Sequence, residues 1–154
     1  MVNDITSYPE GLDLVWIGVD RSGYIGAFIS AGTGPIPKFV LQNTIFLLEN
    51  IEQWVLELSE TSDFLLHVNV PRPDDFIALA KRGLYVYDWT DVYENSSNIK
   101  NTYELMASPL KPLKLSDLID NISKNYLENI KLNLVEFKNS NIIDVKSNLD
   151  CVEG

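Results

Sequence analysis

Residues Leu14–Ile29 read LVWIGVDRSGYIGAFI and contain two apolar runs joined by a short polar turn. The runs Leu14–Val19 and Tyr24–Ile29 are rich in β-branched and aromatic residues, which favour strands. Between them, Asp20-Arg21-Ser22-Gly23 is typical of a type I turn in which glycine takes the positive φ. The segment therefore predicts a β-hairpin. Because nearly every position in it is apolar, we expect burial on both faces or a covering helix.

Helices and further strands are predicted on the C-terminal side of this hairpin. Apolar side chains at three- and four-residue spacing predict a helix from about Phe39 to Ser59. A second helix is predicted from Pro73 to Gly83, because proline suits the first helical position and glycine a helix end. The remaining predicted elements are strands at Phe64–Val70, Leu84–Trp89, Thr102–Ala107 and Ile130–Leu134, and a short helix that Ser116 caps and that carries Leu118, Ile119 and Ile122.

This alternation of hairpins and helices indicates an α+β fold with a mainly antiparallel sheet, on which one long and one or two short helices pack. The length of 154 residues and the hydrophobic fraction of 45% fit one globular domain over residues 1–154. The alternation of apolar and polar residues weakens from about residue 139, which predicts a loosely ordered tail at 139–154. Within this tail, Ile142–Val145 could add a short strand.

The charge of the chain is strongly negative and unevenly distributed. Lys and Arg number 12 against 22 Asp and Glu, which gives a net charge of −10. Residues 1–77 hold eleven acids and three bases, while residues 78–154 hold eleven acids and nine bases, so the two halves contribute −8 and −2. Such a chain repels phosphate groups, and we expect neither direct nucleic-acid binding nor binding to an anionic membrane.

Targeting and redox features favour a cytoplasmic protein. The start Met1-Val2-Asn3-Asp4 lacks the basic residues and apolar run of a signal peptide, and no stretch approaches a membrane span. Cys151 is the single cysteine, so an intrachain disulfide is impossible. We interpret this cysteine as a solvated thiol in the tail.

Two motifs that could carry chemistry have simpler structural interpretations. Gly32-Thr33-Gly34 before a helix suggests a phosphate loop, but Pro35 and Pro37 remove backbone donors, so a structural turn is favoured. His67 has no second histidine and no nearby cysteine with which to bind a metal. We therefore expect it at a core or edge position with a hydrogen-bond partner.

Scattered carboxylates suggest one alternative function. Asp20, Glu49, Asp88 and Asp144 could surround two metal ions, as in a metal-dependent hydrolase, although Asp20 equally suits the turn that it begins. A small-molecule-binding regulatory module, built on the hairpin and the loop Gly32–Pro37, is a further alternative. In the favoured interpretation the chain is not an enzyme and uses no cofactor and no metal.

The stretch from Tyr85 to Glu94 combines aromatic and acidic residues: Tyr85, Tyr87, Trp89 and Tyr93 with Asp88, Asp91 and Glu94. One interpretation is an aromatic strand packed under a helix, followed by a charged loop. The other is a protein interface, in which aromatic anchors supply buried area and carboxylates pair with basic groups of a partner.

Two blocks of the sequence resemble a known family. The first contains Trp16-Ile17-Gly18-Val19-Asp20, Gly23, Ile25-Gly26, Phe28 and Ala31-Gly32-Thr33-Gly34-Pro35-Ile36-Pro37. The second contains Phe76, Leu79-Ala80, Arg82-Gly83-Leu84-Tyr85-Val86-Tyr87-Asp88-Trp89 and Asp91-Val92-Tyr93. Over roughly residues 14–109 the chain resembles small bacterial immunity proteins encoded beside polymorphic or contact-dependent growth-inhibition toxins. The resemblance implies a cytoplasmic protein that binds and neutralises a cognate toxin domain.

Many toxins of such systems act on nucleic acid and are therefore basic around their active sites, so an acidic inhibitor would be steered to them. We predict two candidate surfaces for this partner. One consists of Glu49, Glu52, Glu57 and Glu60 on the predicted long helix, and the other of Asp88, Asp91, Tyr93 and Glu94 after the aromatic strand. The identity of the toxin and the oligomeric state stay open.

Overall fold

The computed structural model describes residues 7–95 and 98–153, with their side chains except at 91–95 and 98–100. The strands are β1 (Val15–Asp20), β2 (Ile25–Ile29), β3 (Ile36–Pro37), β4 (Phe64–Leu66), β5 (Tyr85–Asn95), β6 (Asn98–Pro109), β7 (Lys131–Leu132), β8 (Ile142–Ile143) and β9 (Cys151–Val152). The α-helices are α1 (Lys38–Gln42), α2 (Leu48–Leu56), α3 (Asp74–Ala80) and α4 (Asn121–Glu128). Short 3₁₀ helices are η1 (Leu115–Asp117), η2 (Phe137–Asn139) and η3 (Val145–Ser147).

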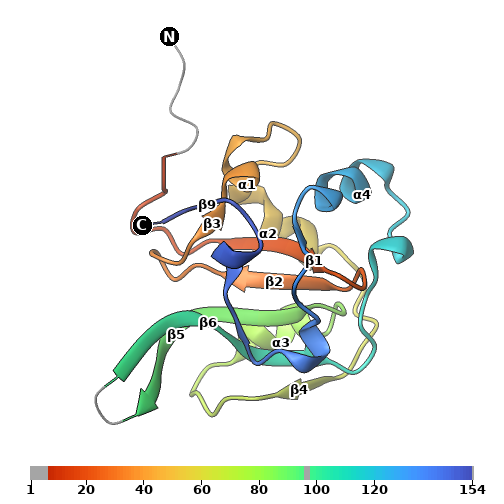
Figure 1. The fold of residues 1–154 in the computed structure, drawn as a ribbon. Coiled ribbons are helices and arrows are strands. Elements are labelled where there is room, and N and C mark those ends of the chain that lie inside the picture. Colours follow the sequence, from red (N-terminus) through yellow and green to blue (C-terminus); the bar gives the residue numbers. More distant parts are fainter. Residues whose placement is uncertain (1–6, 96–97, 154) are drawn as a thin grey trace.

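One mixed sheet forms the centre of the molecule, with strand order β4-β6-β5-β2-β1-β7, and β8 pairs with β6 (Figure 1). The β1–β2 and β5–β6 pairs are antiparallel, whereas β2–β5 and β1–β7 are parallel. The α+β prediction is confirmed. The parallel pairs were not predicted. The β2–β5 pair is parallel because a long connection that includes α3 carries the chain from β2 to β5.

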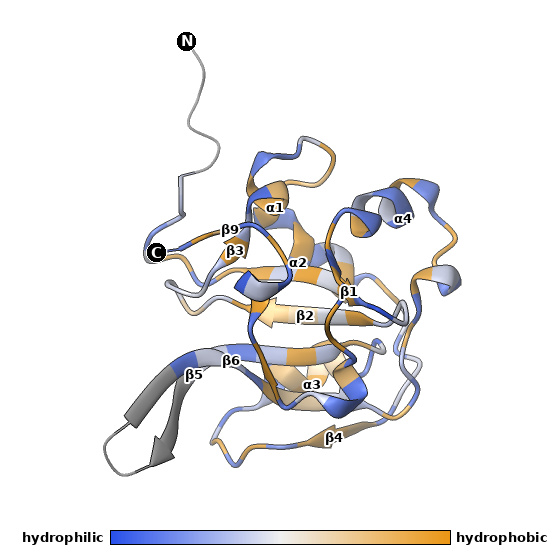
Figure 2. Cartoon of the chain, viewed as in Figure 1, coloured by the Kyte–Doolittle hydropathy of each residue, from blue (hydrophilic) through white to orange (hydrophobic). Residues whose placement is uncertain are grey.

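The predicted hairpin is confirmed as β1 and β2, with Val15 opposite Ile29 and Val19 opposite Ile25. Gly23 takes the positive φ of 89° that the turn requires. Hydrophobic residues concentrate in these central strands (Figure 2). Trp16, Phe28, Tyr87 and Tyr103 are packed together on one face of the sheet. Phe137 joins them from residues 133–153, which we call the C-terminal segment. Helices cover the opposite face, so both faces are buried as the sequence predicted.

The predicted long helix from Phe39 to Ser59 is wrong, because the chain forms two shorter helices, α1 and α2. Asn43 separates them. Its side-chain amide donates to the carbonyls of Phe39 and Val40 at the end of α1. Its side-chain oxygen accepts from the backbone N–H groups of Ile45 and Phe46. Asparagine competes with helical hydrogen bonding in this way, and apolar spacing alone does not reveal it.

The other helices follow the prediction in part. The second predicted helix is confirmed as α3, preceded by Pro73 and followed by Gly83 at a φ of 92°. The cap predicted at Ser116 is wrong, because α4 begins later, where the Asp120 carboxylate accepts from the N–H of Ile122. Leu118 and Ile119, predicted within this helix, therefore precede it, and Ile119 is exposed.

Residues 139–153, within the range predicted as a loose tail, contain two short strands and buried side chains. Ile143 and Val145 are buried, β8 pairs with β6, and β9 pairs with β3. Cys151, predicted as a solvated thiol, is partly buried in the β3–β9 pair, and burial raises the pKa of this thiol to about 12. At neutral pH the group is a protonated thiol and therefore a weak nucleophile.

Candidate functional site

The acidic residues predicted on one long helix fall into separate environments. Glu49 and Glu52 lie on α2, while Glu57 follows its last turn and is exposed. Glu60 lies in the next loop, where its carboxylate oxygens are each 3.8 Å from a cation, Lys81 in one case and Arg82 in the other. Glu60 therefore differs from the other three in lying beside two cations.

Asp88 points to the helix-covered face of the sheet. Side chains alternate along a strand, and its neighbour Tyr87 packs against Phe137 on the opposite face. Asp88 lies opposite Glu104 in the β5–β6 pair. Burial, the charge of Asp13 and the charge of Glu104 raise the pKa of Asp88 to about 6, against a smaller lowering by the N–H of Trp89.

Asp13 connects Asp88 with Glu52. The pKa of Glu52 is raised by partial burial and then by the charges of Asp75 and Asp13. Asp13 itself is held in place because its carboxylate accepts from the N–H of Ala31 at 2.9 Å. The charges of Asp13, Asp75 and Glu104 thus act on the pKa of Glu52 or of Asp88, and we call these five residues the carboxylate cluster. Within the described side chains none of them forms an ion pair.

The carboxylate cluster joins one residue from each predicted surface. Glu52 belongs to the first and Asp88 to the second. The side chains of Asp91, Tyr93 and Glu94 lie outside the described residues, although their backbone belongs to β5. Sequence reasoning missed Asp13, Asp75 and Glu104. The pairing of two predicted strands could have suggested Glu104 as a neighbour of Asp88, but their register was not known in advance.

The carboxylates considered for a metal site are not brought together. Asp20 is buried, and its side-chain oxygens accept from the backbone N–H groups of Ser22, Tyr24 and Phe137 at 2.9–3.0 Å. Its structural role in the turn is therefore clear. Among the described residues, no group of three or more His, Cys, Asp or Glu side chains has the geometry to hold a metal ion.

The other two motifs also have structural roles. The N–H groups of Thr33 and Gly34 both donate to the Ser30 carbonyl, so they are not available to a phosphate. A Cβ at Gly34 would come within 2.7 Å of the Tyr103 hydroxyl, which explains the need for glycine there. His67 follows the edge strand β4, where its Nε2 is 2.7 Å from the Ser108 hydroxyl. Both structural interpretations made from the sequence are confirmed.

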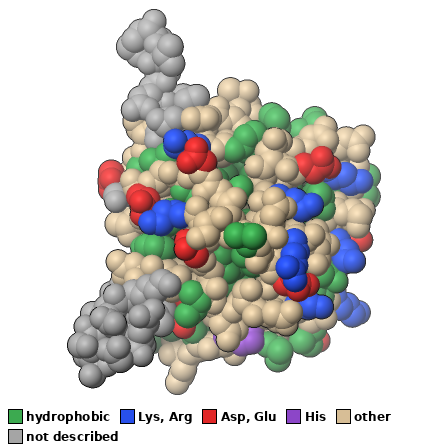
Figure 3. Space-filling model, viewed as in Figure 1, with side chains coloured by type: hydrophobic (Ala, Val, Ile, Leu, Met, Phe, Trp, Pro, Cys, Tyr) green, Lys and Arg blue, Asp and Glu red, His purple; other side chains and the backbone are tan. Residues whose placement is uncertain are grey.

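The face of the molecule that carries the C-terminal segment has a balanced charge. Figure 3 shows Lys and Arg side chains interspersed with Asp and Glu on this face. Three ion pairs involve this segment: Arg21–Glu136, Lys38–Asp150 and Lys146–Glu153. The carboxylate cluster lies on the opposite side of the sheet, towards α2 and α3.

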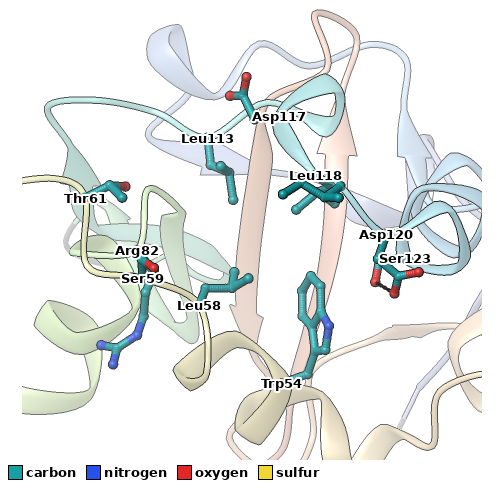
Figure 4. A pocket seen from close by; sticks show the side chains of 11 residues that line it. Trp54, Leu58, Ser59, Thr61, Arg82, Leu113, Asp117, Leu118, Asp120 and Ser123 are labelled. Carbon is teal, nitrogen blue, oxygen red and sulfur yellow. Dashed lines mark hydrogen bonds between the residues drawn. The ribbon is translucent and has the colours of Figure 1, made fainter.

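A separate pocket of about 350 Å³ lies between α2, η1 and the start of α4. In Figure 4 the side chains of Trp54, Leu58, Leu113 and Leu118 surround its centre. Thr61 lies on one side and the hydrogen-bonded pair Asp120 and Ser123 on the other. The guanidinium of Arg82 points away from the centre, towards the carbonyls of Ala78 and Leu56. The pocket is therefore mainly apolar.

Comparisons with protein-family models, curated proteins and solved structures find no match to this chain. Among the described residues, no helix combines the length and apolar character needed to cross a lipid bilayer.

Proposed function

We propose that this protein binds and neutralises a basic protein partner in the cytoplasm, as an immunity protein does with its cognate toxin domain. The observation that supports this proposal best is the carboxylate cluster. It draws five acids from α2, α3, β5, β6 and the segment before β1, without a paired cation among the described side chains.

The electrostatics of the carboxylate cluster fit a site for external positive charge. Burial, and after it the charges of neighbouring acids, raises the pKa of both Asp88 and Glu52, so ionising them costs free energy in the isolated protein. A lysine or arginine of a partner would remove that cost. Concentrated negative charge would also accelerate the encounter with a basic protein, by roughly 10 to 1,000-fold at low salt.

The direct test is protection against a toxin. The chain is co-expressed with the C-terminal domain encoded by the neighbouring reading frame, and growth is measured. We expect that domain to be basic and to arrest growth, and we expect the wild-type chain to restore growth. The double variant Glu52→Gln with Asp88→Asn should protect less, since it removes two charges from the carboxylate cluster.

The matched control is Asp63→Asn with Glu128→Gln, which removes the same charge from exposed positions outside the cluster. Circular dichroism verifies that both double variants fold. The proposal fails if the wild-type chain gives no protection. It also fails if the two double variants protect equally, because net charge alone would then explain the effect.

A second candidate function is a small-molecule-binding regulatory module. The apolar pocket around Trp54 supports it, because about 350 Å³ falls within the range of roughly 300–1,000 Å³ found for small-ligand sites. A thermal-shift screen of small aromatic compounds tests this candidate, with the intrinsic tryptophan fluorescence that Trp54→Phe removes as the second readout. A ligand that raises the melting temperature and changes that fluorescence supports it, and a screen without such a ligand argues against it.

A further inference from the structure

A shallow groove lies beside the carboxylate cluster, between the segment before β1 and the helices α1 and α2. Its volume is about 230 Å³, and its apolar lining includes Leu12, Leu14, Val40, Leu47 and Leu48. Two of these side chains are largely open to solvent, with exposed fractions of 56% for Leu12 and 51% for Leu47. Ile45, two residues before Leu47, is 51% exposed. Exposed aliphatic residues gathered in this way mark interaction surfaces.

The loop that presents these aliphatic side chains is fixed in place. Asn43 accepts hydrogen bonds from the N–H groups of Ile45 and Phe46, and its amide donates to α1. Beyond the loop, the Leu47 carbonyl accepts from the N–H of Asn50 in the first turn of α2. On the other wall, the Leu14 N–H donates to the Ser30 hydroxyl. A partner would meet a preformed groove and would pay little entropy to order it.

The rim of the groove is acidic. Glu49 lines it, Asp13 directly follows Leu12 in the chain, and Glu52 lies one turn further along α2. The two bases within residues 7–60 do not neutralise these acids, since Arg21 pairs with Glu136 and Lys38 with Asp150. The groove thus combines an apolar centre with a negative rim that forms no ion pair among the described side chains.

We propose that this groove anchors one aliphatic side chain of a basic segment of the partner, whose lysines or arginines meet Asp13, Glu49 and Glu52. The inference rests on the proposed function and specifies the chemistry of its partner. The groove volume suits a side chain, because it lies below the roughly 300–1,000 Å³ of small-ligand sites. Charge favours a basic occupant, whereas a second copy of this chain would bring its own acidic rim.

Two synthetic peptides of equal charge test the proposal. One contains four Lys-Lys-Leu repeats and the other four Lys-Lys-Ser repeats. Each is titrated into the ¹⁵N-labelled full chain at low salt, and amide shifts give both the affinity and the site. Burying a leucine is worth roughly tenfold or more in affinity, so we expect the leucine peptide to bind at least about tenfold more tightly. Its shifts should map to Leu12, Leu14 and Leu47.

The variant Leu47→Ser should remove the advantage of the leucine peptide and leave binding of the serine peptide unchanged. The matched control is Leu134→Ser, which changes an exposed leucine elsewhere and should retain the full advantage. Both substitutions lie at exposed positions, so neither is expected to unfold the protein. The spectra of the free variants verify this.

The outcomes separate the anchor site from the proposed function. Equal binding of the two peptides overturns the groove as an anchor and leaves the attraction for basic partners intact. If the leucine peptide shifts the amides around Trp54 and not those of the groove, the groove is likewise overturned as an anchor and the attraction for basic partners stays intact. If neither peptide binds, both proposals fail. If the groove amides shift with protein concentration alone, a second copy is the occupant and the inference is wrong.

Discussion

Asp88 shows how one side chain connects stability with the proposed function. Its half-buried carboxylate lies near Asp13 and Glu104, and its pKa is about 6 instead of the ordinary 3.8. Folding favours the protonated form of Asp88, and this preference adds to the free energy of unfolding. The added stability is complete below about pH 3.8 and is lost as the pH rises through about 6. At neutral pH the charge therefore destabilises the free protein.

We expect Asp88→Asn to raise the free energy of unfolding at about pH 8 by about 1 kcal/mol, after allowance for solvent screening. Near pH 4 the effect should almost vanish, since wild-type Asp88 is then mostly protonated. Urea denaturation at the two pH values measures the difference. If the variant is less stable than the wild type at about pH 8, the carboxylate makes a favourable contact and repulsion does not dominate.

Asp20 is the opposite case, a buried acid whose bonding is complete. Its carboxylate accepts three backbone N–H groups, including that of Phe137 from the C-terminal segment. Asp20→Ala should lower the free energy of unfolding by about 3–5 kcal/mol, because the Phe137 N–H becomes unsatisfied in a buried place. Asp20→Asn should cost less, since its amide oxygen still accepts in the turn. A neutral or stabilising alanine variant would contradict this structural role of Asp20.

At the scale of elements, the break between α1 and α2 is decisive, because it shapes the loop that carries Ile45 and Leu47. Asn43→Ala removes four side-chain hydrogen bonds and should lower the free energy of unfolding by about 1–2 kcal/mol. Asn50→Ala, at an exposed position within α2, is the control and should change it by less than about 0.5 kcal/mol. An unchanged free energy of unfolding for Asn43→Ala would show that the break depends on something else.

Local patterns predicted the elements well wherever the decisive interactions were local. The hairpin turn of Asp20–Gly23 and the helix between Pro73 and Gly83 follow from residues within each segment. The break at Asn43 was missed because apolar spacing continues through it. The ordered C-terminal segment was missed because its strands are only two residues long and depend on distant partners, β6 and β3.

The candidate site was predicted only in part, for a similar reason. Glu52 and Asp88 were both named, but on separate surfaces. Asp13 connects them through its influence on the pKa of both carboxyl groups, and this arrangement depends on the parallel pairing of β2 with β5. That pairing joins segments far apart in the chain, and no local pattern encodes it.

At the scale of the whole molecule, charge is distributed according to two different requirements. The side with the C-terminal segment pairs its acids with bases, which suits a passive surface (Figure 3). The carboxylate cluster instead retains repulsive charge that reduces the stability of the free protein. Retention of a destabilising group is expected where function requires it. The account therefore predicts a trade-off: neutralising the cluster stabilises the protein and weakens its binding to cations.

The most direct test is the dissociation constant of the Lys-Lys-Ser peptide at low salt and at about 0.15 M salt. It is measured for the wild type, for Glu52→Gln with Asp88→Asn, and for the control Asp63→Asn with Glu128→Gln. We predict that the cluster variant binds about five- to tenfold more weakly than the other two at low salt, and that this difference shrinks at about 0.15 M salt. Equal binding by the two double variants would contradict the account, because only net charge would then matter.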